Sequence, residues 1–137
     1  MRKLFGTDGI RGRAYEYPLT EDIAEKLGYA VAIFSEKPKI VIGRDTRVSG
    51  KDFETAVVKG VSKAGGEAIL LGILPTPAVA FLTRKLNAGA GIMISASHNP
   101  AQDNGLKIFS SKGFKLEDEI GEEIEILMFK EQKEIPN

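Results

Sequence analysis

Three short, continuous apolar runs separated by amphipathic segments constrain the fold of this 137-residue chain most strongly. The runs cover residues 40–42, 68–71 and 90–94, and none of them alternates between apolar and polar side chains. Such runs are typical of parallel strands that crossover helices bury on both faces of a sheet. Because these crossovers are right-handed, the sequence predicts a three-layer α/β/α sandwich.

Four segments have the spacing of apolar residues that is typical of amphipathic helices. The first, residues 20–34, places Ile23, Leu27 and Val31 on one face, and Thr20 is its candidate N-cap. Further helices are expected at residues 53–64, 78–86 and 117–129.

A fourth strand is expected at residues 106–109, because this apolar segment follows the third run without a helix between them. The connection contains Asn104-Gly105, a pair typical of hairpins, so this strand should run antiparallel to the third. The fold class is therefore α/β, with a mixed, mainly parallel four-stranded sheet in a domain over residues 1–129. The polar residues 130–137 are predicted to be a linker.

The composition removes several classes of function. Nineteen basic residues balance nineteen acidic ones, so neither a nucleic acid nor an anionic membrane is expected as a partner. The absence of cysteine excludes disulfides and thiol catalysis, and the single histidine, His98, excludes a multi-histidine metal site. No signal peptide is visible, and the apolar runs are far shorter than the roughly 20 residues of a membrane span. A cytoplasmic location is therefore expected.

Ligands of parallel α/β sheets bind beyond the carboxyl ends of the strands. Three loops leave such ends here, at residues 43–50, 72–77 and 95–105, and they should share one rim of the sheet.

Most of the arginines lie in glycine-bounded segments near these ends. A guanidinium binds phosphate at two points, and a glycine-rich backbone lets N–H groups approach an anion, which favours a phosphate site. Ion pairs among Arg44, Asp45 and Arg47 that only shape their loop explain the pattern equally well. Four of the six arginines are in these segments: Arg11, Arg13, Arg44 and Arg47.

The third loop concentrates groups that can do chemistry. It contains the only histidine, His98, directly after Ser97, and Asn99, Asp103 and Lys107 follow within ten residues. A nucleophile, a base and a cation are thus close together at the end of a strand. A turn without chemistry is the other interpretation, and a serine hydrolase fits poorly because the serine is not in a Gly-x-Ser-x-Gly elbow.

The segment 95–100 (SASHNP) resembles the phosphoserine loop of the α-D-phosphohexomutases. The resemblance extends, in the family's order, over nearly the whole chain. Four further segments resemble other signatures of this family: 4–12 (LFGTDGIRG), 43–50 (GRDTRVSG), 75–80 (PTPAVA) and 103–107 (DNGLK). The resemblance implies that this chain is the family's first domain, an α/β/α sandwich with a mixed sheet.

In that family a phosphoserine gives its phosphoryl group to a hexose phosphate. The hexose 1,6-bisphosphate formed turns around and returns its other phosphate to the serine. The amino-acid sequences of the motifs are most similar to those of the bacterial branch that interconverts glucosamine 6-phosphate and glucosamine 1-phosphate. Branches that act on glucose or mannose phosphates have similar motifs, so the motifs do not determine which sugar is the substrate. A phosphosugar-binding module without turnover and a purely structural α/β domain are the alternatives of other classes.

The resemblance assigns roles to individual residues. Ser97 matches the serine that carries the phosphoryl group. Lys107 and Arg11 match basic residues that stabilise phosphoryl oxygens and assist proton transfer, and His98 is a second candidate for the proton step. The remaining residues of the predicted site support the loop or the phosphate: Asn99, Arg44 and Arg47.

The resemblance also implies groups that this chain does not contain. Mg²⁺ should bind the phosphate on Ser97 and, on its other side, aspartates of a later domain. The expected partners are therefore a phosphosugar substrate and the remaining domains of a longer enzyme, without which the chain should have little mutase activity. Whether the chain forms a homodimer is left open by the sequence.

Overall fold

The computed structural model describes residues 4–6 and 9–136. Within these residues the chain forms one sheet and four helices. In chain order the elements are β1 (Ile10–Arg13), α1 (Glu21–Phe34), β2 (Lys39–Arg44), α2 (Gly50–Lys63), β3 (Glu67–Ile73), α3 (Thr76–Lys85), β4 (Ala90–Ile94), β5 (Asp103–Ser110) and α4 (Asp118–Phe129).

The sheet is mixed, with the strand order β1-β5-β4-β2-β3. Strand β2 pairs in parallel with both β3 and β4, which confirms the parallel arrangement expected from the three apolar runs. Strand β5 is antiparallel to β4, as the Asn104-Gly105 connection predicts. It is also antiparallel to β1, so β1 runs in the same direction as β2, β3 and β4.

The prediction of four strands is wrong, because the sheet has five. The additional strand, β1, lies at one edge and pairs Ile10 with Leu106 and Arg13 with Asp103. Only Ile10 of its four residues is buried, and the segment IRGR contains neither an apolar run nor a clear alternation. An edge strand held by one neighbour needs little apolar surface, so hydrophobic patterning could not reveal it.

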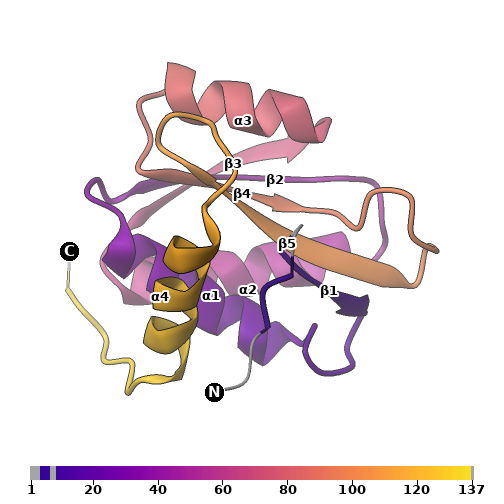
Figure 1. The fold of residues 1–137 in the computed structure, drawn as a ribbon, viewed down its shortest axis with the longest axis horizontal. Coiled ribbons are helices and arrows are strands. Elements are labelled where there is room, and N and C mark those ends of the chain that lie inside the picture. Colours follow the sequence, from indigo (N-terminus) through magenta and orange to yellow (C-terminus); the bar gives the residue numbers. More distant parts are fainter. Residues whose placement is uncertain (1–3, 7–8, 137) are drawn as a thin grey trace.

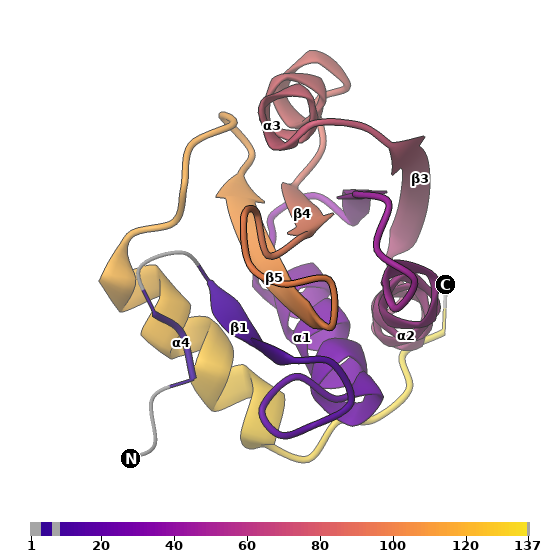
Figure 2. The ribbon, with the colours of Figure 1, turned by 90° about the vertical axis from the view of Figure 1, so that its right-hand side faces the viewer.

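The elements form the predicted three layers. Helices α1, α2 and α4 cover one face of the sheet, and α3 covers the other (Figure 1). The view along the sheet shows that α3 lies alone on its side (Figure 2). It packs mainly on β2 and β4, away from the edge formed by β1. None of the helices in the described part of the chain is long and apolar enough to cross a membrane.

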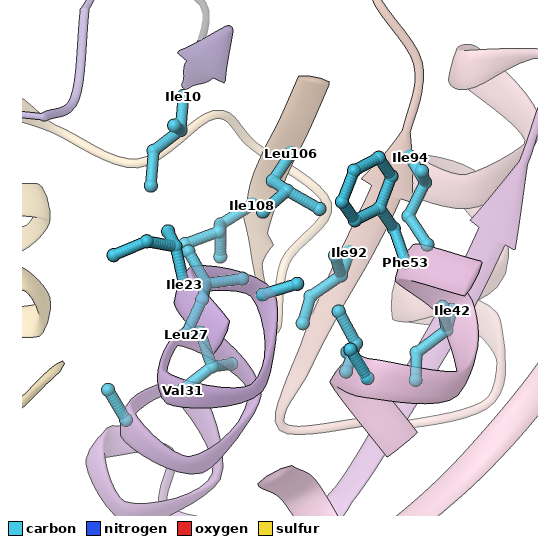
Figure 3. Close-up of a cluster of buried hydrophobic side chains, with 14 of the residues drawn as sticks. Ile10, Ile23, Leu27, Val31, Ile42, Phe53, Ile92, Ile94, Leu106 and Ile108 are labelled. Carbon is cyan, nitrogen blue, oxygen red and sulfur yellow. The ribbon is translucent and has the colours of Figure 1, made fainter. Parts of the chain in front are cut away.

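The main core lies between the sheet and the helices α1 and α2 (Figure 3). Helix α1 contributes Ile23, Leu27 and Val31, as its spacing predicts, and Thr20 caps its first turn by accepting a hydrogen bond from the Ile23 amide. Burying one such side chain contributes about 1.5–3 kcal/mol. The other large, fully buried side chains of this core are Ile10, Leu19, Ile40, Ile42, Phe53, Ile92, Ile94, Leu106, Ile124 and Met128.

Helices α1 and α2 approach so closely that a glycine is required at their contact. A Cβ atom on Gly60 would overlap the backbone oxygen of Glu25, whereas a Cβ atom on Gly121 of α4 would lie 3.8 Å from Phe5. Both glycines are inside helices, where alanine is intrinsically better by roughly 1 kcal/mol.

The substitutions Gly60→Ala and Gly121→Ala should therefore have opposite effects. At Gly60 the overlap with a rigid backbone outweighs propensity, and we expect a loss of about 1–3 kcal/mol in the free energy of unfolding. Gly121→Ala is expected to be neutral or stabilising by up to about 1 kcal/mol. Urea denaturation of the two variants measures both values, and equal effects would contradict the close approach of α1 and α2.

The connection after β1 is tied to the first turn of α2. Tyr15 stacks on Phe53 with ring centroids 5.5 Å apart, and its hydroxyl donates to Asp52 Oδ2 at 2.6 Å. This hydrogen bond is the main cause that raises the pKa of Tyr15 to about 12, with burial and the charge of Asp52 adding to it.

The raised pKa of Tyr15 predicts a loss of stability at alkaline pH. Because the pKa in the folded chain exceeds the ordinary value of 10.0, the contact stabilises fully below pH 10 and is lost as the pH rises toward about 12. NMR titration of ¹³Cζ-labelled tyrosine should show this shift, and Asp52→Asn should return the Tyr15 pKa toward its ordinary value. A Tyr15 pKa that does not respond to Asp52→Asn would contradict the assigned cause.

Residues 130–136 form neither a helix nor a strand but lie along α1 and α2. The Tyr29 hydroxyl donates to the backbone oxygen of Lys133 at 2.7 Å, and the Ile135 amide donates to the backbone oxygen of Lys63 at 2.7 Å. The polar segment expected to be a linker is thus held against the helical layer up to Ile135.

Candidate functional site

The three rim loops lie side by side at the carboxyl ends of the parallel strands. The Asp45 amide donates to the backbone oxygen of Ile94, which joins the loop after β2 to the end of β4. The Leu74 amide donates to the backbone oxygen of Arg44, which joins the loop after β3 to the same place. The expectation that the loops share one rim is confirmed for these contacts.

Ser97 lies on this rim, in the loop that follows β4. Its side chain is exposed, and its Oγ accepts hydrogen bonds from Lys107 Nζ at 3.0 Å and from Arg11 Nη2 at 3.3 Å. Its backbone φ is +56°, in the left-handed region, which costs a residue with a Cβ atom roughly 1–2 kcal/mol. The surrounding contacts must offset this cost.

The two cations reach Ser97 from the sheet itself. Leu106 and Ile108 of β5 point into the core, so Lys107 between them emerges from the opposite face. On β1, Ile10 is likewise buried, and Arg11 points to the same face as Lys107. This part of the sheet lies beside the area that α3 covers, which leaves room for both side chains.

A glycine on β5 makes the path of Arg11 feasible. Gly105 pairs with Arg11 in the sheet, and a Cβ atom on Gly105 would lie 3.2 Å from Arg11 Cγ. The same Cβ atom would lie 2.6 Å from the backbone oxygen of Ser95. Any larger side chain would therefore push against both Arg11 and the loop between β4 and β5 (residues 95–102), which we call the serine loop.

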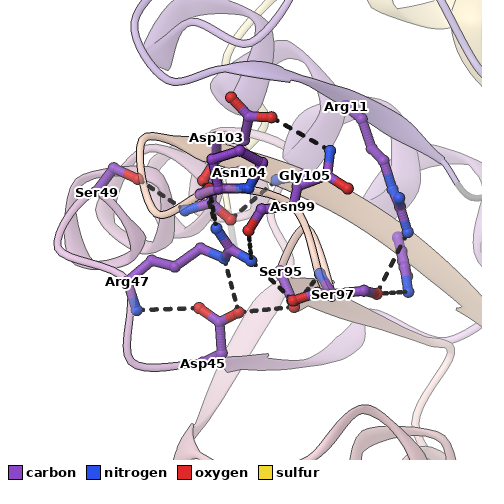
Figure 4. A network of polar contacts seen from close by, with 12 residues as sticks. Arg11, Asp45, Arg47, Ser49, Ser95, Ser97, Asn99, Asp103, Asn104 and Gly105 are labelled. Carbon is purple, nitrogen blue, oxygen red and sulfur yellow. Dashed lines mark hydrogen bonds and ion pairs between the residues drawn. The ribbon is translucent and has the colours of Figure 1, made fainter.

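The Arg47 side chain binds backbone oxygens of the serine loop and of the start of β5 (Figure 4). Its Nη1 donates to the backbone oxygens of Pro100 and Asp103, and its Nη2 donates to those of Ser97 and Asn99, at distances of 2.6–3.1 Å. The Arg47 side chain is only 9% exposed. A planar guanidinium with five donors suits this task, which a lysine could not perform.

The Arg47 guanidinium also pairs with Asp45. Arg47 Nε donates to Asp45 Oδ2 at 3.0 Å, and the Arg47 amide donates to Oδ1 at 3.1 Å. Ser95 completes the cluster, because its hydroxyl donates to Asp45 Oδ2 at 2.7 Å and accepts from the Ser97 amide at 3.0 Å. Figure 4 shows Ser95 between Asp45 and Ser97.

The other predicted residues are placed differently. His98 is exposed, and no hydrogen bond joins it to another residue in the described part of the chain. Asn99 Nδ2 donates to Asp103 Oδ2 at 3.3 Å and so spans the loop. Arg44 points toward α2, where its Nε lies 3.5 Å from Glu54 Oε2, and both side chains are largely buried.

Sequence reasoning brought together Ser97, Lys107 and Arg11 but missed three residues that shape their site. The sequence indicates Asp45 only as a local ion-pair partner and Gly105 only as a hairpin residue, and it assigns no separate role to Ser95. A weak signal existed for Ser95, because it is a polar residue directly after a buried strand and two positions before Ser97. Thr7 and Asp8 of the segment 4–12 lie outside the described residues.

A cavity of about 230 Å³ opens beside Lys107. Its apolar lining consists of Phe5, Ile108, Phe109 and Leu116, and its polar lining of Thr76, Lys107, Lys115, Glu117 and Asp118. The site thus continues from the exposed serine into a partly apolar hollow between β5 and α4.

The metal-binding capacity of the described residues is small. Residues 4–6 and 9–136 contain no group of three or more His, Asp or Glu side chains arranged to hold a metal ion. Asp45, the carboxylate next to the serine loop, is already bonded to Arg47 and Ser95. A phosphate on the exposed Ser97 would supply an oxygen donor of the kind Mg²⁺ prefers.

Solved structures share this fold. A phosphoglucomutase/phosphomannomutase family protein of Burkholderia thailandensis matches with a TM-score of 0.83 at 25% identity, over 98% of this chain and 31% of that chain. Parafusin, a phosphoglucomutase of Paramecium, matches with a TM-score of 0.76 at 20% identity, over 95% of this chain and 26% of that chain, which shows the fold alone. The fold and the serine loop together therefore define a phosphohexomutase domain.

The sequence match identifies the family. Residues 2–135 match the family model described as phosphoglucomutase/phosphomannomutase, alpha/beta/alpha domain I, and the chain belongs to this family. Two relatives called phosphoglucosamine mutase are similar to it. The Heliobacterium modesticaldum protein is 57% identical over 91% of this chain, and the Pseudomonas putida protein is 55% identical over 93%. The chain spans 28% and 29% of the length of these two relatives.

Proposed function

We propose that this chain is the phosphoserine-bearing domain of a mutase that interconverts glucosamine 6-phosphate and glucosamine 1-phosphate. The observation that carries the proposal is the exposed Ser97 Oγ between Lys107 Nζ at 3.0 Å and Arg11 Nη2 at 3.3 Å. Two cations at one serine oxygen can offset the charge of a phosphoryl group bound there. The relatives called phosphoglucosamine mutase, at 55–57% identity, support an amino sugar as the substrate.

The reaction consists of two phosphoryl transfers. In the first, the bond between phosphorus and the Ser97 oxygen breaks while a sugar hydroxyl forms a new bond to phosphorus. The sugar hydroxyl loses a proton and Ser97 Oγ gains one, which yields free serine and a hexosamine 1,6-bisphosphate. After the bisphosphate turns around, its other phosphoryl group returns to Ser97 by the reverse exchange. Positioning and charge neutralisation supply most of the catalysis in such transfers.

This chain supplies a serine, two cations and a base to these steps. Lys107 and Arg11 offset the charge on the phosphoryl oxygens and assist the proton transfer at the sugar hydroxyl. His98, exposed next to Ser97, is the second group that could carry this proton. Arg47 and Asn99 hold the serine loop, and Arg44 joins the neighbouring loop to α2.

Mg²⁺ would further offset the negative charge on the phosphoryl oxygens when bound. Within this chain Ser97 would hold the ion through its phosphate. The other ligands would come from the additional domains of a longer enzyme, which are also the partners that would complete the sugar site. The 137-residue chain alone is therefore expected to have little mutase activity. The proposed location of the reaction is the cytoplasm.

A chimaeric enzyme tests the proposal. This chain would replace the matching segment of the Heliobacterium modesticaldum relative, and the purified protein would be incubated with glucosamine 1,6-bisphosphate and Mg²⁺. Intact mass spectrometry should detect one added phosphate, and peptide mapping should locate it on Ser97. Glucosamine 6-phosphate should then be converted to glucosamine 1-phosphate.

Three results would each change the proposal in a different way. A phosphate on another residue would remove Ser97 as the carrier. Binding of the bisphosphate without any phosphate transfer would favour a phosphosugar-binding module. Phosphate on Ser97 without any conversion of glucosamine 6-phosphate would keep Ser97 as the carrier but count against glucosamine phosphates as the substrate.

A further inference from the structure

Ser97 is held through its backbone by side chains that never touch its hydroxyl. Ser95 is buried, and its Oγ accepts a hydrogen bond from the Ser97 amide at 3.0 Å. The same hydroxyl donates to Asp45 Oδ2 at 2.7 Å. A hydroxyl can accept and donate at once, whereas a carboxylate or an ammonium group can do only one of the two. Ser95 therefore transmits the position of Asp45 to the Ser97 amide.

The carbonyl side of Ser97 is bound to the same ion pair. Arg47 Nη2 donates to the backbone oxygen of Ser97 at 2.8 Å, and Arg47 is bonded to Asp45 through both its Nε and its amide. The N–H and C=O groups of Ser97 thus both end on the Asp45–Arg47 pair, one through Ser95 and the other directly. With both groups fixed, the peptide planes on either side of Ser97 have little freedom to rotate.

This double attachment explains the unusual backbone of Ser97. Its φ of +56° is a conformation that serine rarely adopts without help from its surroundings. In this conformation the Oγ meets Lys107 and Arg11. Relaxation to the extended or helical region would turn the Cβ–Oγ bond away from these cations.

We propose that Asp45 and Ser95 are positioning residues for phosphoryl transfer at Ser97, an inference that rests on the proposed function. They keep Ser97 in the left-handed conformation and so place its oxygen between the two cations. Because Ser95 occupies the Ser97 amide, the phosphate is stabilised by the side chains of Lys107 and Arg11 and not by that N–H group. Asp45 acts through geometry, since its charge is already paired with Arg47.

Hydrogen exchange in the 137-residue chain tests the contact without requiring activity. Ser95→Ala removes the acceptor, and the Ser97 amide should exchange about tenfold faster or more, as expected when a hydrogen bond is lost. Amides of the central strand β4, such as that of Ile92, should keep their rates. Thr83→Val is the matched control, because it removes another buried hydroxyl, which bonds within α3. An unchanged exchange rate at Ser97 in Ser95→Ala would overturn the inference.

Kinetics of the chimaeric enzyme test the consequence for catalysis. Misplacement of a reacting atom by about 1 Å can cost on the order of 100-fold in rate, so Ser95→Ala should lower kcat by about 10- to 100-fold with little change in KM. Ser95→Thr keeps the hydroxyl and should retain most of the kcat, whereas Thr83→Val should match the parent. Normal kcat in Ser95→Ala, or an equal loss in Ser95→Thr, would contradict a positioning role.

Asp45→Asn provides a second, independent variant that also serves if Ser95→Ala does not fold. An amide there places an N–H group against either the Arg47 amide or the Ser95 and Arg47 Nε donors, so the cluster cannot keep all its bonds. Positioning predicts a lower kcat. If Asp45 acted only through its charge, removing that charge beside a phosphate would lower KM or raise turnover, and this result would overturn the inference.

The proposed function and the inference can fail separately. If the parent chimaera never takes up phosphate, the proposed function is wrong, and the exchange experiment still decides whether Ser95 holds Ser97. If the parent takes up phosphate on Ser97 and Ser95→Ala does so equally fast, only the inference is wrong.

Discussion

The chimaeric enzyme carrying Ser97→Ala is expected to lose phosphoryl transfer almost completely, with kcat lower by on the order of 10⁴-fold or more. The proposed reaction proceeds through a covalent phosphoserine, and alanine offers no oxygen to form it. The loss should be visible both as the absence of added phosphate and as the absence of sugar phosphate conversion. The fold should be unaffected, because the Ser97 side chain is exposed and replacement by alanine leaves the backbone contacts of Ser97 intact.

Ser111→Ala is the matched control for this experiment. Ser111 is also exposed and lies just beyond the end of β5, so its removal costs the chain one hydroxyl without touching the serine loop. Parent-like turnover is expected. Substantial turnover in Ser97→Ala together with parent-like urea denaturation would show that the phosphoryl group travels by another route.

The second large effect is expected for Lys107→Met. Lys107 Nζ lies 3.0 Å from Ser97 Oγ, and methionine keeps the length of the side chain but not its charge. Losing one preorganised donor to a developing charge typically lowers kcat by about 100- to 1,000-fold, which corresponds to roughly 3–4 kcal/mol. We expect a loss in this range, measured as the rate of glucosamine 6-phosphate conversion by the chimaeric enzyme.

Two further variants show whether the effect of Lys107→Met comes from the lost contact with Ser97 or from the lost positive charge. Lys107→Arg keeps the charge with a different geometry and should recover part of the rate. Lys115→Met removes an exposed cation from the neighbouring cavity and should cost far less, because no hydrogen bond joins Lys115 to Ser97. Equal losses for Lys107→Met and Lys115→Met would mean that the general positive field, and not the contact with Ser97, supports catalysis.

Much of this fold follows from local patterns in the sequence. The apolar runs at 40–42 and 90–94 form adjacent parallel strands. Strands that are buried on both faces of a sheet require continuous apolar runs, so the sequence pattern predicts them. The segment 10–13 escaped prediction for the opposite reason. It is an edge strand in which Ile10 alone is buried, and its pairing with β5 depends on residues far away in the sequence.

The candidate site was predictable only in part. Ser97 and Lys107 are close in the sequence, and the resemblance to a phosphoserine loop singled out both of them along with Arg11. The support beneath them depends on contacts between loops that are about fifty residues apart in the sequence, such as Asp45 with Ser95. Composition and spacing carry no information about which of several polar side chains will meet across two loops. Gly105 was similarly hidden, since its role is defined by the path of Arg11 above it.

The pairing of the edge strand β1 with β5 joins residues that are far apart in the sequence, and this bears on when the site forms during folding. Arg11 reaches Ser97 only when Ile10 is aligned with Leu106, and this pairing closes a loop that spans most of the chain. Contacts between such distant residues carry the largest loop-closure entropy and tend to form after local helices and neighbouring strands. We therefore expect Arg11 to reach Ser97 late in folding, so that an incompletely folded molecule presents Ser97 without Arg11 beside it.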